Sequence, residues 1–137
     1  MKDRLVELAL KARENSYSPY SGYSVGAALL ASSGKVYTGC NVENASFTPT
    51  VCAERTAFFK AVSEGEKSFE AIAVVGGRED TSSPSYPCGV CRQVMREFCD
   101  DSFKVIVVNG AETEEYTLAE LLPRSFSKLS VDGEKHR

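Results

Sequence analysis

The sequence lacks tryptophan, and its single histidine, His136, is the next-to-last of 137 residues. Histidine is the most frequent metal ligand and acid–base group in proteins, so chemistry that depends on it is nearly excluded here. No apolar run reaches the length of about 18 residues that a membrane-spanning helix needs. The N-terminal stretch MKDRLVELAL is charged and unlike a secretion signal. We therefore expect a cytoplasmic protein without a membrane partner.

The chain also lacks a basic stripe, and its net charge is −3. A phosphate backbone is bound mainly through clustered lysine and arginine side chains, so we expect no nucleic-acid partner. Hydrophobic residues make up 42% of the sequence, which is enough for one core but not for two. We therefore expect a single domain over residues 1–137.

Hydrophobic periodicity and turn residues divide the chain into four expected helices and five expected strands. The helices are expected at 3–16, 52–63, 88–98 and 118–122, the last one after a capping box of Thr117 and Glu120. The strands are expected at 25–31, 36–42, 70–75, 104–109 and 114–117. The first two strands form a hairpin, whereas strands linked through helices require parallel crossovers. We therefore predict an α/β fold with a mixed five-stranded sheet sandwiched by helices.

The number of cysteines is odd, which favours thiols or metal ligands over a disulfide framework in a chain without a secretion signal. Three of the five lie at the expected starts of two helices: Cys52 in VCAER, and Cys88 and Cys91 in PCGVC. The positive end of a helix dipole favours the thiolate that zinc requires. Zinc held by three protein ligands keeps a fourth position open for water, so this pattern predicts a catalytic zinc site.

The charge of such a site requires compensation. Three thiolates around a divalent cation leave a net charge of −1, which is a poor setting for ionising a bound water. Two helix dipoles draw some of this charge away, and Arg55, one turn beyond Cys52, is placed to donate hydrogen bonds to the thiolates. Metal-assisted hydrolysis also needs a proton carrier, and Glu54, two residues after Cys52, is the leading candidate.

Other interpretations of these residues remain open at this point. The PCGVC motif alone is also typical of a redox dithiol, as in thioredoxin. A structural zinc site with Cys40 as a fourth ligand would make the domain a binding module, although Cys40 and Cys99 are most simply small core residues. Without further information, Arg55 is an ordinary solvated helix charge.

Several motifs occur in an order that resembles a known family. CAER, followed after about thirty residues by PCGVCRQV, resembles the zinc-dependent cytidine deaminases of the small homotetrameric class. PYSGYSVGAALL resembles the segment that begins their sheet, GCNVENASF their ribose-binding segment, and LLPRSF their C-terminal signature. The resemblance extends through most of the chain and implies the cytidine deaminase fold.

The resemblance implies a Zn²⁺ cofactor held by Cys52, Cys88 and Cys91, with Glu54 as the proton shuttle. In this chemistry a zinc-activated hydroxide attacks C4 of the cytosine ring. The expected reaction is the hydrolytic deamination of cytidine and deoxycytidine to uridine and deoxyuridine with release of ammonia, a step of pyrimidine salvage.

The resemblance also assigns contacts to the nucleoside substrate. Ala53 is expected to offer its backbone N–H to the pyrimidine, and Asn41 and Glu43 are expected to bind the sugar hydroxyls. Alternate residues of a strand project from one face, which agrees with the last assignment. Phe126 is expected to enter the active site of a neighbouring subunit in a homotetramer with shared active sites. In the absence of the resemblance, Asn41 and Glu43 are turn or strand-end residues without a ligand, and Tyr23 and Phe126 are core or interface aromatics.

Two features depart from the family pattern. Tyr23, an expected substrate contact, stands where many members carry phenylalanine, and its hydroxyl needs a partner if it is buried. The segment FTPT before Val51 differs from the usual approach to the first ligand. A related deaminase that inactivates the antibiotic blasticidin S shares the zinc motif, so a modified or antibiotic nucleoside is the alternative substrate.

Overall fold

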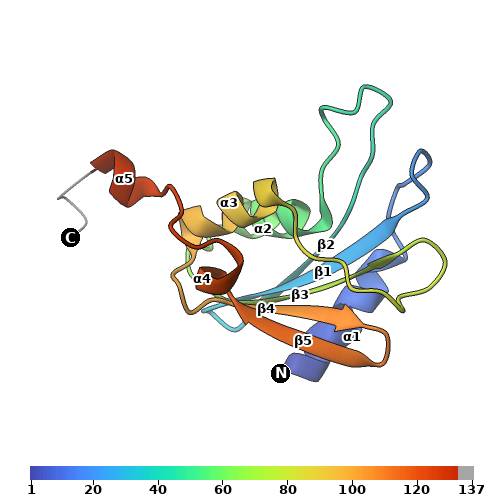
Figure 1. Ribbon diagram of the computed structural model, residues 1–137, viewed down its shortest axis with the longest axis horizontal. Coiled ribbons are helices and arrows are strands. Elements are labelled where there is room, and N and C mark those ends of the chain that lie inside the picture. The colour runs from blue at the N-terminus through green and yellow to red at the C-terminus, as the bar shows by residue number, and fades with distance from the viewer. Residues whose placement is uncertain (133–137) are drawn as a thin grey trace.

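The structure is a computed structural model in which residues 1–132 are described (Figure 1). The helices are α1 (Lys2–Arg13), α2 (Ala53–Ser63), α3 (Gly89–Phe98), α4 (Leu118–Leu121) and α5 (Lys128–Asp132). The strands are β1 (Ser24–Ala31), β2 (Val36–Cys40), β3 (Phe69–Gly77), β4 (Lys104–Asn109) and β5 (Glu112–Thr117). All nine elements expected from the sequence are present, and α5 is an addition that the sequence patterns did not predict.

The strands form one five-stranded sheet in the order β2-β1-β3-β4-β5. β1 pairs antiparallel with both β2 and β3, β3 pairs parallel with β4, and β4 pairs antiparallel with β5. The predicted mixed sheet and the hairpin are therefore confirmed. The parallel pair β3–β4 is connected through α3, as a crossover connection requires.

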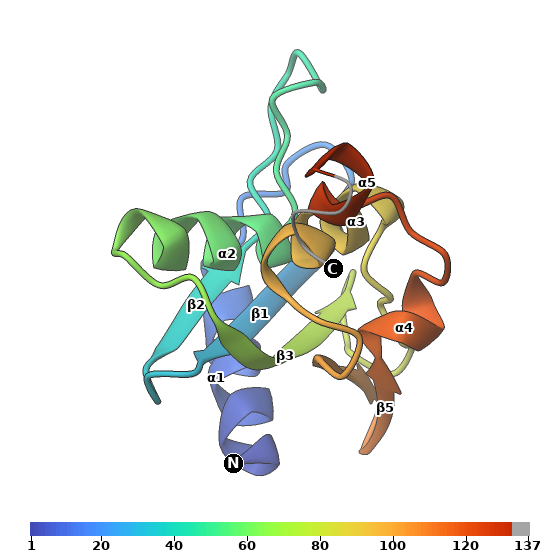
Figure 2. The same cartoon turned by 90° about the vertical axis from the view of Figure 1, so that its left-hand side faces the viewer.

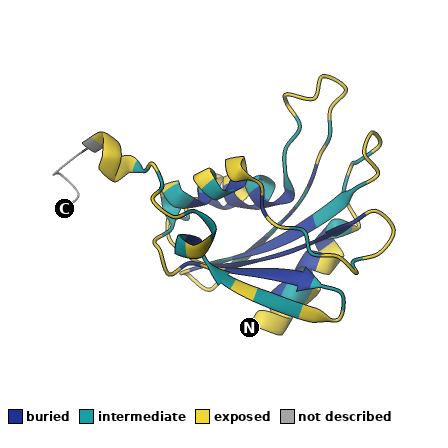
Figure 3. Cartoon of the chain, viewed as in Figure 1, coloured by how far each residue is buried: buried dark blue, intermediate teal, exposed yellow. Residues whose placement is uncertain are grey.

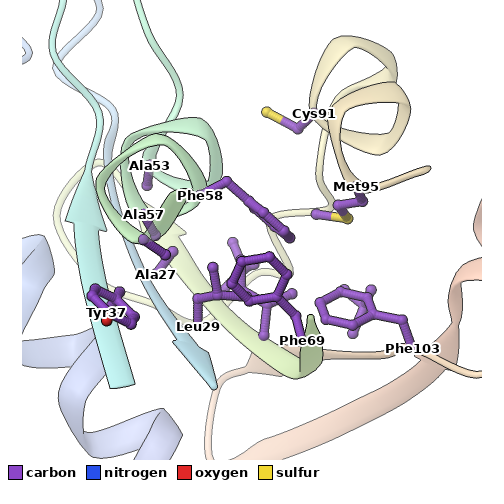
Figure 4. Packing of buried hydrophobic residues seen from close by; sticks show 14 of the residues in the cluster. Ala27, Leu29, Tyr37, Ala53, Ala57, Phe58, Phe69, Cys91, Met95 and Phe103 are labelled. Atoms are coloured by element: carbon purple, nitrogen blue, oxygen red, sulfur yellow. The ribbon is translucent and has the colours of Figure 1, made fainter. Parts of the chain in front are cut away.

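Helices cover both faces of the sheet, with α1 on one side and α2 and α3 together on the other (Figures 1 and 2). The central strands β1, β3 and β4 are mostly buried, whereas the edge strand β5 has no buried residue and the connecting loops and α5 are largely exposed (Figure 3). Phe58 of α2 anchors the second face, because its ring packs against Phe69 and Phe103 with centroids 5.1 and 6.0 Å away (Figure 4). Complete burial of such a ring contributes about 2–3 kcal/mol to folding.

Two glycines allow helices to approach the sheet closely from opposite faces. A Cβ atom added at Gly39 of β2 would lie 2.5 Å from the carbonyl oxygen of Ala53, and one added at Gly26 of β1 would lie 2.1 Å from that of Ala9. Contacts this short exclude any side chain. The first turn of α2 is thereby seated directly on β2, in a position fixed by the sheet.

Some expected element boundaries were wrong by one or a few residues. β2 ends at Cys40 rather than at residue 42, so Asn41 lies just beyond the strand that was expected to include it. Val42 instead forms isolated bridges with Tyr17 and Val51, which hold the two ends of a projecting loop together. The helix expected at 88–98 begins at Gly89, because Cys88 is its N-cap residue. The predicted capping box of Thr117 and Glu120 is present.

Within the described residues, no helix is long and apolar enough to cross a membrane. His136 lies outside the described residues.

Candidate active site

Three cysteine side chains come together where the N-termini of α2 and α3 meet. The Sγ atom of Cys88 lies 3.7 Å from that of Cys52 and 3.6 Å from that of Cys91, and all three lie within 4.8 Å of one another. Cys40 is not part of this group. The structure therefore brings together the three cysteines that the sequence predicted and leaves out the fourth cysteine of the alternative, structural site.

Local backbone geometry explains this convergence. Cys52 and Cys88 are the N-cap residues of α2 and α3, with extended ψ angles of 156° and 168° that turn the chain into each helix. Cys91 lies one turn into α3 and points toward α2 (Figure 4). Cys88 and Cys91 thus come from the start of α3, and Cys52 comes from the start of α2. Both helices are held by the same apolar core, which fixes the distance between them.

Hydrogen bonds and charge favour a thiolate in this cluster. A hydrogen bond from Cys91, with further help from Arg55, lowers the pKa of the Cys52 thiol to about 5. The same hydrogen bond to Cys52, together with burial and the neighbouring negative charges, raises the pKa of Cys91 far above its usual value. Without a metal ion, the protein therefore favours the thiolate of Cys52 and the neutral thiol of Cys91, because neighbouring thiolates repel each other. A divalent cation among the sulfurs removes this competition, since it stabilises each thiolate that binds it.

The spacing of the sulfurs fits zinc. Ligand sulfurs at tetrahedral corners about 2.3 Å from a zinc ion are about 3.8 Å apart. The observed separations of 3.7 and 3.6 Å are close to that value. With three thiol ligands, a tetrahedral ion keeps one position for a further ligand, as catalytic zinc sites do.

Arg55 makes the contact that the charge argument predicted. Its Nη2 donates a hydrogen bond of 3.3 Å to Cys52 Sγ. Burial disfavours the charged guanidinium, but the hydrogen bonds to Cys52 and Cys91 outweigh this effect and raise the pKa of Arg55. Its Nε atom is buried and has no hydrogen-bond partner among the described residues, so one donor remains available beside the cluster.

Glu54 is the one buried carboxylate among the described residues, with a relative exposure of 4%. Burial, reinforced by the charge at Cys52, raises the pKa of its carboxyl to about 7. A group with this pKa exchanges a proton readily near neutral pH, which suits a general acid and base. Ala53, beside it, opens the first turn of α2, where no described side chain caps the helix. The backbone N–H groups of such a turn lack intrahelical partners and are available to a ligand.

Asn41 and Glu43 hold the backbone that leads to the cluster. Asn41 is 9% exposed, and its side chain accepts from the Val25 N–H and donates to the Tyr23 carbonyl. Glu43 accepts hydrogen bonds from the Ser21 hydroxyl and from the backbone N–H groups of Tyr20 and Ser21. The hydroxyl bond, with the help of the two backbone bonds, lowers the pKa of its carboxyl. Both side chains therefore already bind the segment around residues 20–25, a function that the sequence did not indicate.

The two expected aromatic contacts lie apart from the cysteine cluster in sequence and differ in exposure. Tyr23 is half-buried at the start of β1, and its ring lies beside Gly76. Phe126 is 65% exposed on the segment between α4 and α5, which extends away from the sheet (Figure 1). Within the described residues, Phe126 is attached through its carbonyl oxygen, which accepts a hydrogen bond of 2.8 Å from Gln93 Nε2.

Arg92 directly follows Cys91, and its sequence pattern indicated no function for it. Its guanidinium donates hydrogen bonds to two backbone carbonyls, at Pro87 and Leu121. One feature of the sequence could have indicated this function: the arginine directly follows a candidate ligand on a helix. A side chain at that position points back toward the start of the helix.

Comparisons with known proteins agree with this geometry. Residues 1–108 match the family described as "Cytidine and deoxycytidylate deaminase zinc-binding region". The chain is 54% identical to a cytidine deaminase of Sporosarcina psychrophila, with 92% of this chain and 91% of that protein covered. It is 50% identical to one of Halalkalibacterium halodurans, with 92% and 94% covered. Its fold is similar to the crystal structure of cytidine deaminase from Burkholderia pseudomallei, with a TM-score of 0.85 at 46% identity and 92% and 99% of the two chains covered.

Proposed function

The chain belongs to the cytidine and deoxycytidylate deaminase family, and from this premise we propose that it catalyses the hydrolytic deamination of cytidine and deoxycytidine. Cytidine and water give uridine and ammonia, in a step of pyrimidine salvage. The observation that carries the proposal is the buried carboxyl of Glu54 beside three convergent thiols. Residues 1–137 act as one catalytic domain in this proposal.

Cys52, Cys88 and Cys91 hold the zinc ion, which supplies a polarised water as the nucleophile when it is bound. Glu54 takes one proton from the attacking water and delivers it to ring nitrogen N3 while the water oxygen bonds to C4. The carboxyl then carries the second proton from that oxygen to the amino group, so that the C4–N bond breaks and ammonia leaves. The raised pKa of about 7 supports this cycle, because the carboxyl both accepts and returns protons near neutral pH. Glu54 lies in the first turn of α2 and is 4% exposed, so bulk solvent has little access to its carboxyl.

Arg55 offsets the negative charge of the thiolates. A site of three thiolates and one divalent cation has a net charge of −1, which opposes loss of a proton from the nucleophile. The guanidinium withdraws charge from Cys52 through its hydrogen bond. In this proposal Arg55 raises the rate without contacting the substrate.

The nucleoside lies across the start of α2. The backbone N–H of Ala53 contacts the pyrimidine, and Asn41 and Glu43 contact the sugar hydroxyls. Tyr23 lines the same side of the substrate. The oxygens of Asn41 and Glu43 already accept bonds from backbone groups, which supports a pre-organised sugar site rather than one formed when the substrate enters.

We place Phe126 in the active site of a neighbouring subunit within a homotetramer. Its exposed ring supports this, because 65% of its surface remains open in the single chain. A groove of about 560 Å³ along α2 and α3, lined by Phe59, Val90, Val94 and Phe98 among others, offers apolar surface for a second copy. Stacking of Phe126 on the pyrimidine then closes the site.

An ultraviolet absorbance assay on protein of known zinc content tests the proposal. The substrates are cytidine, deoxycytidine, cytosine, adenosine and blasticidin S. We expect turnover of cytidine and deoxycytidine and none of cytosine or adenosine, because the sugar contacts require a nucleoside and the ring contacts a pyrimidine. Turnover of blasticidin S alone would identify the antibiotic alternative. A fully zinc-loaded protein that turns over no substrate would point instead to a binding module.

A further inference from the structure

The three candidate ligands are held in place by different means. Cys91 is 1% exposed inside the apolar core, and Cys52 receives a hydrogen bond from Arg55. Cys88 is exposed, and no described side chain caps the helix that it begins. The position of its sulfur therefore depends on the backbone immediately before it.

Arg92 fixes that backbone. Its Nε atom donates a hydrogen bond of 2.7 Å to the carbonyl oxygen of Pro87, the residue that precedes Cys88. Proline has no N–H to donate, so a bond to its carbonyl is the main polar attachment open to it. Pro87 is also fully buried, where an unpaired carbonyl would be costly. Arg92 thus closes a loop from α3 back to the residue that positions Cys88.

The other arm of the guanidinium binds the C-terminal part of the chain. Nη1 of Arg92 donates a hydrogen bond of 2.8 Å to the carbonyl oxygen of Leu121, the last residue of α4. The next residue of α3, Gln93, donates to the carbonyl oxygen of Phe126. Two consecutive side chains therefore attach the segment that carries Phe126 to the helix that carries two of the cysteines.

We propose that Arg92 is a positioning residue for the reaction, which joins the Cys88 side of the zinc site to the C-terminal segment. The inference rests on the proposed function and deepens it. The planar guanidinium of Arg92 donates to the carbonyl oxygens of Pro87 and Leu121 in two fixed directions, and the ammonium group of a lysine reproduces this geometry poorly. Loss of the guanidinium removes the hydrogen bonds to Pro87 and Leu121 together. Zinc retention and the closure of the C-terminal segment over the substrate should therefore change in the same variant.

Four variants test the inference: Arg92→Gln, Arg92→Lys, Gln93→Ala and the control Arg96→Gln. Arg96 lies one turn further along α3 and pairs with Asp101 at 2.9 Å rather than with the backbone before Cys88. The first measurement is the rate at which zinc passes to a chromogenic chelator without substrate. The second is kcat and KM for cytidine, and thermal unfolding shows how far each variant is destabilised.

We expect zinc affinity to fall about 10- to 100-fold in Arg92→Gln, as partners that orient metal ligands generally contribute, with faster release and a lower kcat. Arg92→Lys, which keeps the charge and one hydrogen bond, should release zinc at an intermediate rate and remains informative if the glutamine variant does not fold. Gln93→Ala should raise KM and leave zinc release unchanged. Arg96→Gln should lower the unfolding temperature and leave zinc release unchanged.

Wild-type zinc retention in both Arg92 variants would overturn the inference, and so would equal acceleration of zinc release by Arg96→Gln. These results are separable from failure of the proposed function. In that case the zinc-loaded wild-type protein itself fails to deaminate cytidine, whatever the variants do.

Discussion

The two sides of the candidate active site differ in how much of their environment one chain supplies. On the cysteine side, Cys91 and Glu54 are 1% and 4% exposed, and their helices pack on a central sheet. On the C-terminal side, Phe126 is 65% exposed and is carried by a segment that extends from the body of the molecule (Figure 3). From this difference we infer that one chain supplies the groups proposed for the chemistry, whereas the proposed closure over a substrate depends on contacts with a second chain.

Packing within the single chain explains how the cysteine side is held without contacts from a second chain. Gly39 seats the first turn of α2 on the sheet, and the ring of Phe58 anchors the same helix in the core. The positions of Cys52 and Glu54 therefore follow from the most buried part of the molecule. A segment attached by a few hydrogen bonds, by contrast, opens at low free-energy cost.

The largest expected effect is on the cysteine side, for Cys88→Ala. Removal of one of three ligands should abolish zinc retention after dialysis and reduce deamination to background. Cys40→Ala is the matched control, because Cys40 lies outside the cluster, and it should keep the metal. Zinc content of each purified variant, measured by atomic emission, checks both outcomes. Loss of zinc from Cys40→Ala would contradict a site with three protein ligands.

Next in size is Glu54→Gln, which removes the proton carrier and leaves the thiols in place. Turnover should fall by about 10²- to 10⁴-fold, as expected for the loss of a general acid and base. Zinc content and the unfolding temperature should stay near wild-type values, because the amide fits the same buried space. Steady-state kinetics with cytidine measure the loss, and retained turnover would remove Glu54 from the mechanism.

A smaller effect is expected for Arg55→Gln. Loss of a hydrogen bond to a charged group costs about 1.5–3 kcal/mol, so kcat or zinc retention should fall about 10- to 100-fold. KM for cytidine should change little, since Arg55 contacts the thiolate of Cys52 rather than the proposed substrate position. Kinetics and zinc content at fixed pH check this. An unchanged enzyme would show that the thiolates need no such compensation.

Features set by nearby residues could be predicted from the sequence, whereas contacts between distant segments could not be predicted from local patterns. The five strands, the hairpin and the starts of α2 and α3 follow from alternation, turn residues and caps, which act within a few residues. The convergence of Cys52 with Cys88 is a tertiary contact, and it was predicted because spacing and residue type resembled a family. Helix periodicity alone would have placed both cysteines at helix starts without bringing them together.

Other features were out of reach for physical reasons. The carbonyl partners of Arg92 lie 5 and 29 residues away, and only the folded chain brings them together. Asn41 was expected on a strand, but its amide bonds to the backbone of Val25 and Tyr23 instead, and β2 ends one residue earlier. Helix α5 has only five residues, which is too short for a helical repeat of apolar residues to be recognised in its sequence.

The smallest expected effect belongs to the C-terminal side. Phe126→Ala should raise KM for cytidine about 5- to 10-fold, because an aromatic pair contributes about 1 kcal/mol beyond the area that it buries. It should also weaken assembly, if the ring is buried between subunits. Phe126→Leu separates these two effects, since leucine keeps apolar area and loses the π face.

Sedimentation of both variants, alongside their KM values, completes the comparison. If the ring stacks on the pyrimidine of a neighbouring site, Phe126→Leu assembles as the wild type does and still shows the raised KM. If the ring serves assembly alone, Phe126→Leu behaves as the wild type in both measurements, and the shared site is refuted. An unchanged KM and assembly state in Phe126→Ala would show that one chain closes its own site. That result would contradict the inference drawn from the difference in exposure between Phe126 and Glu54.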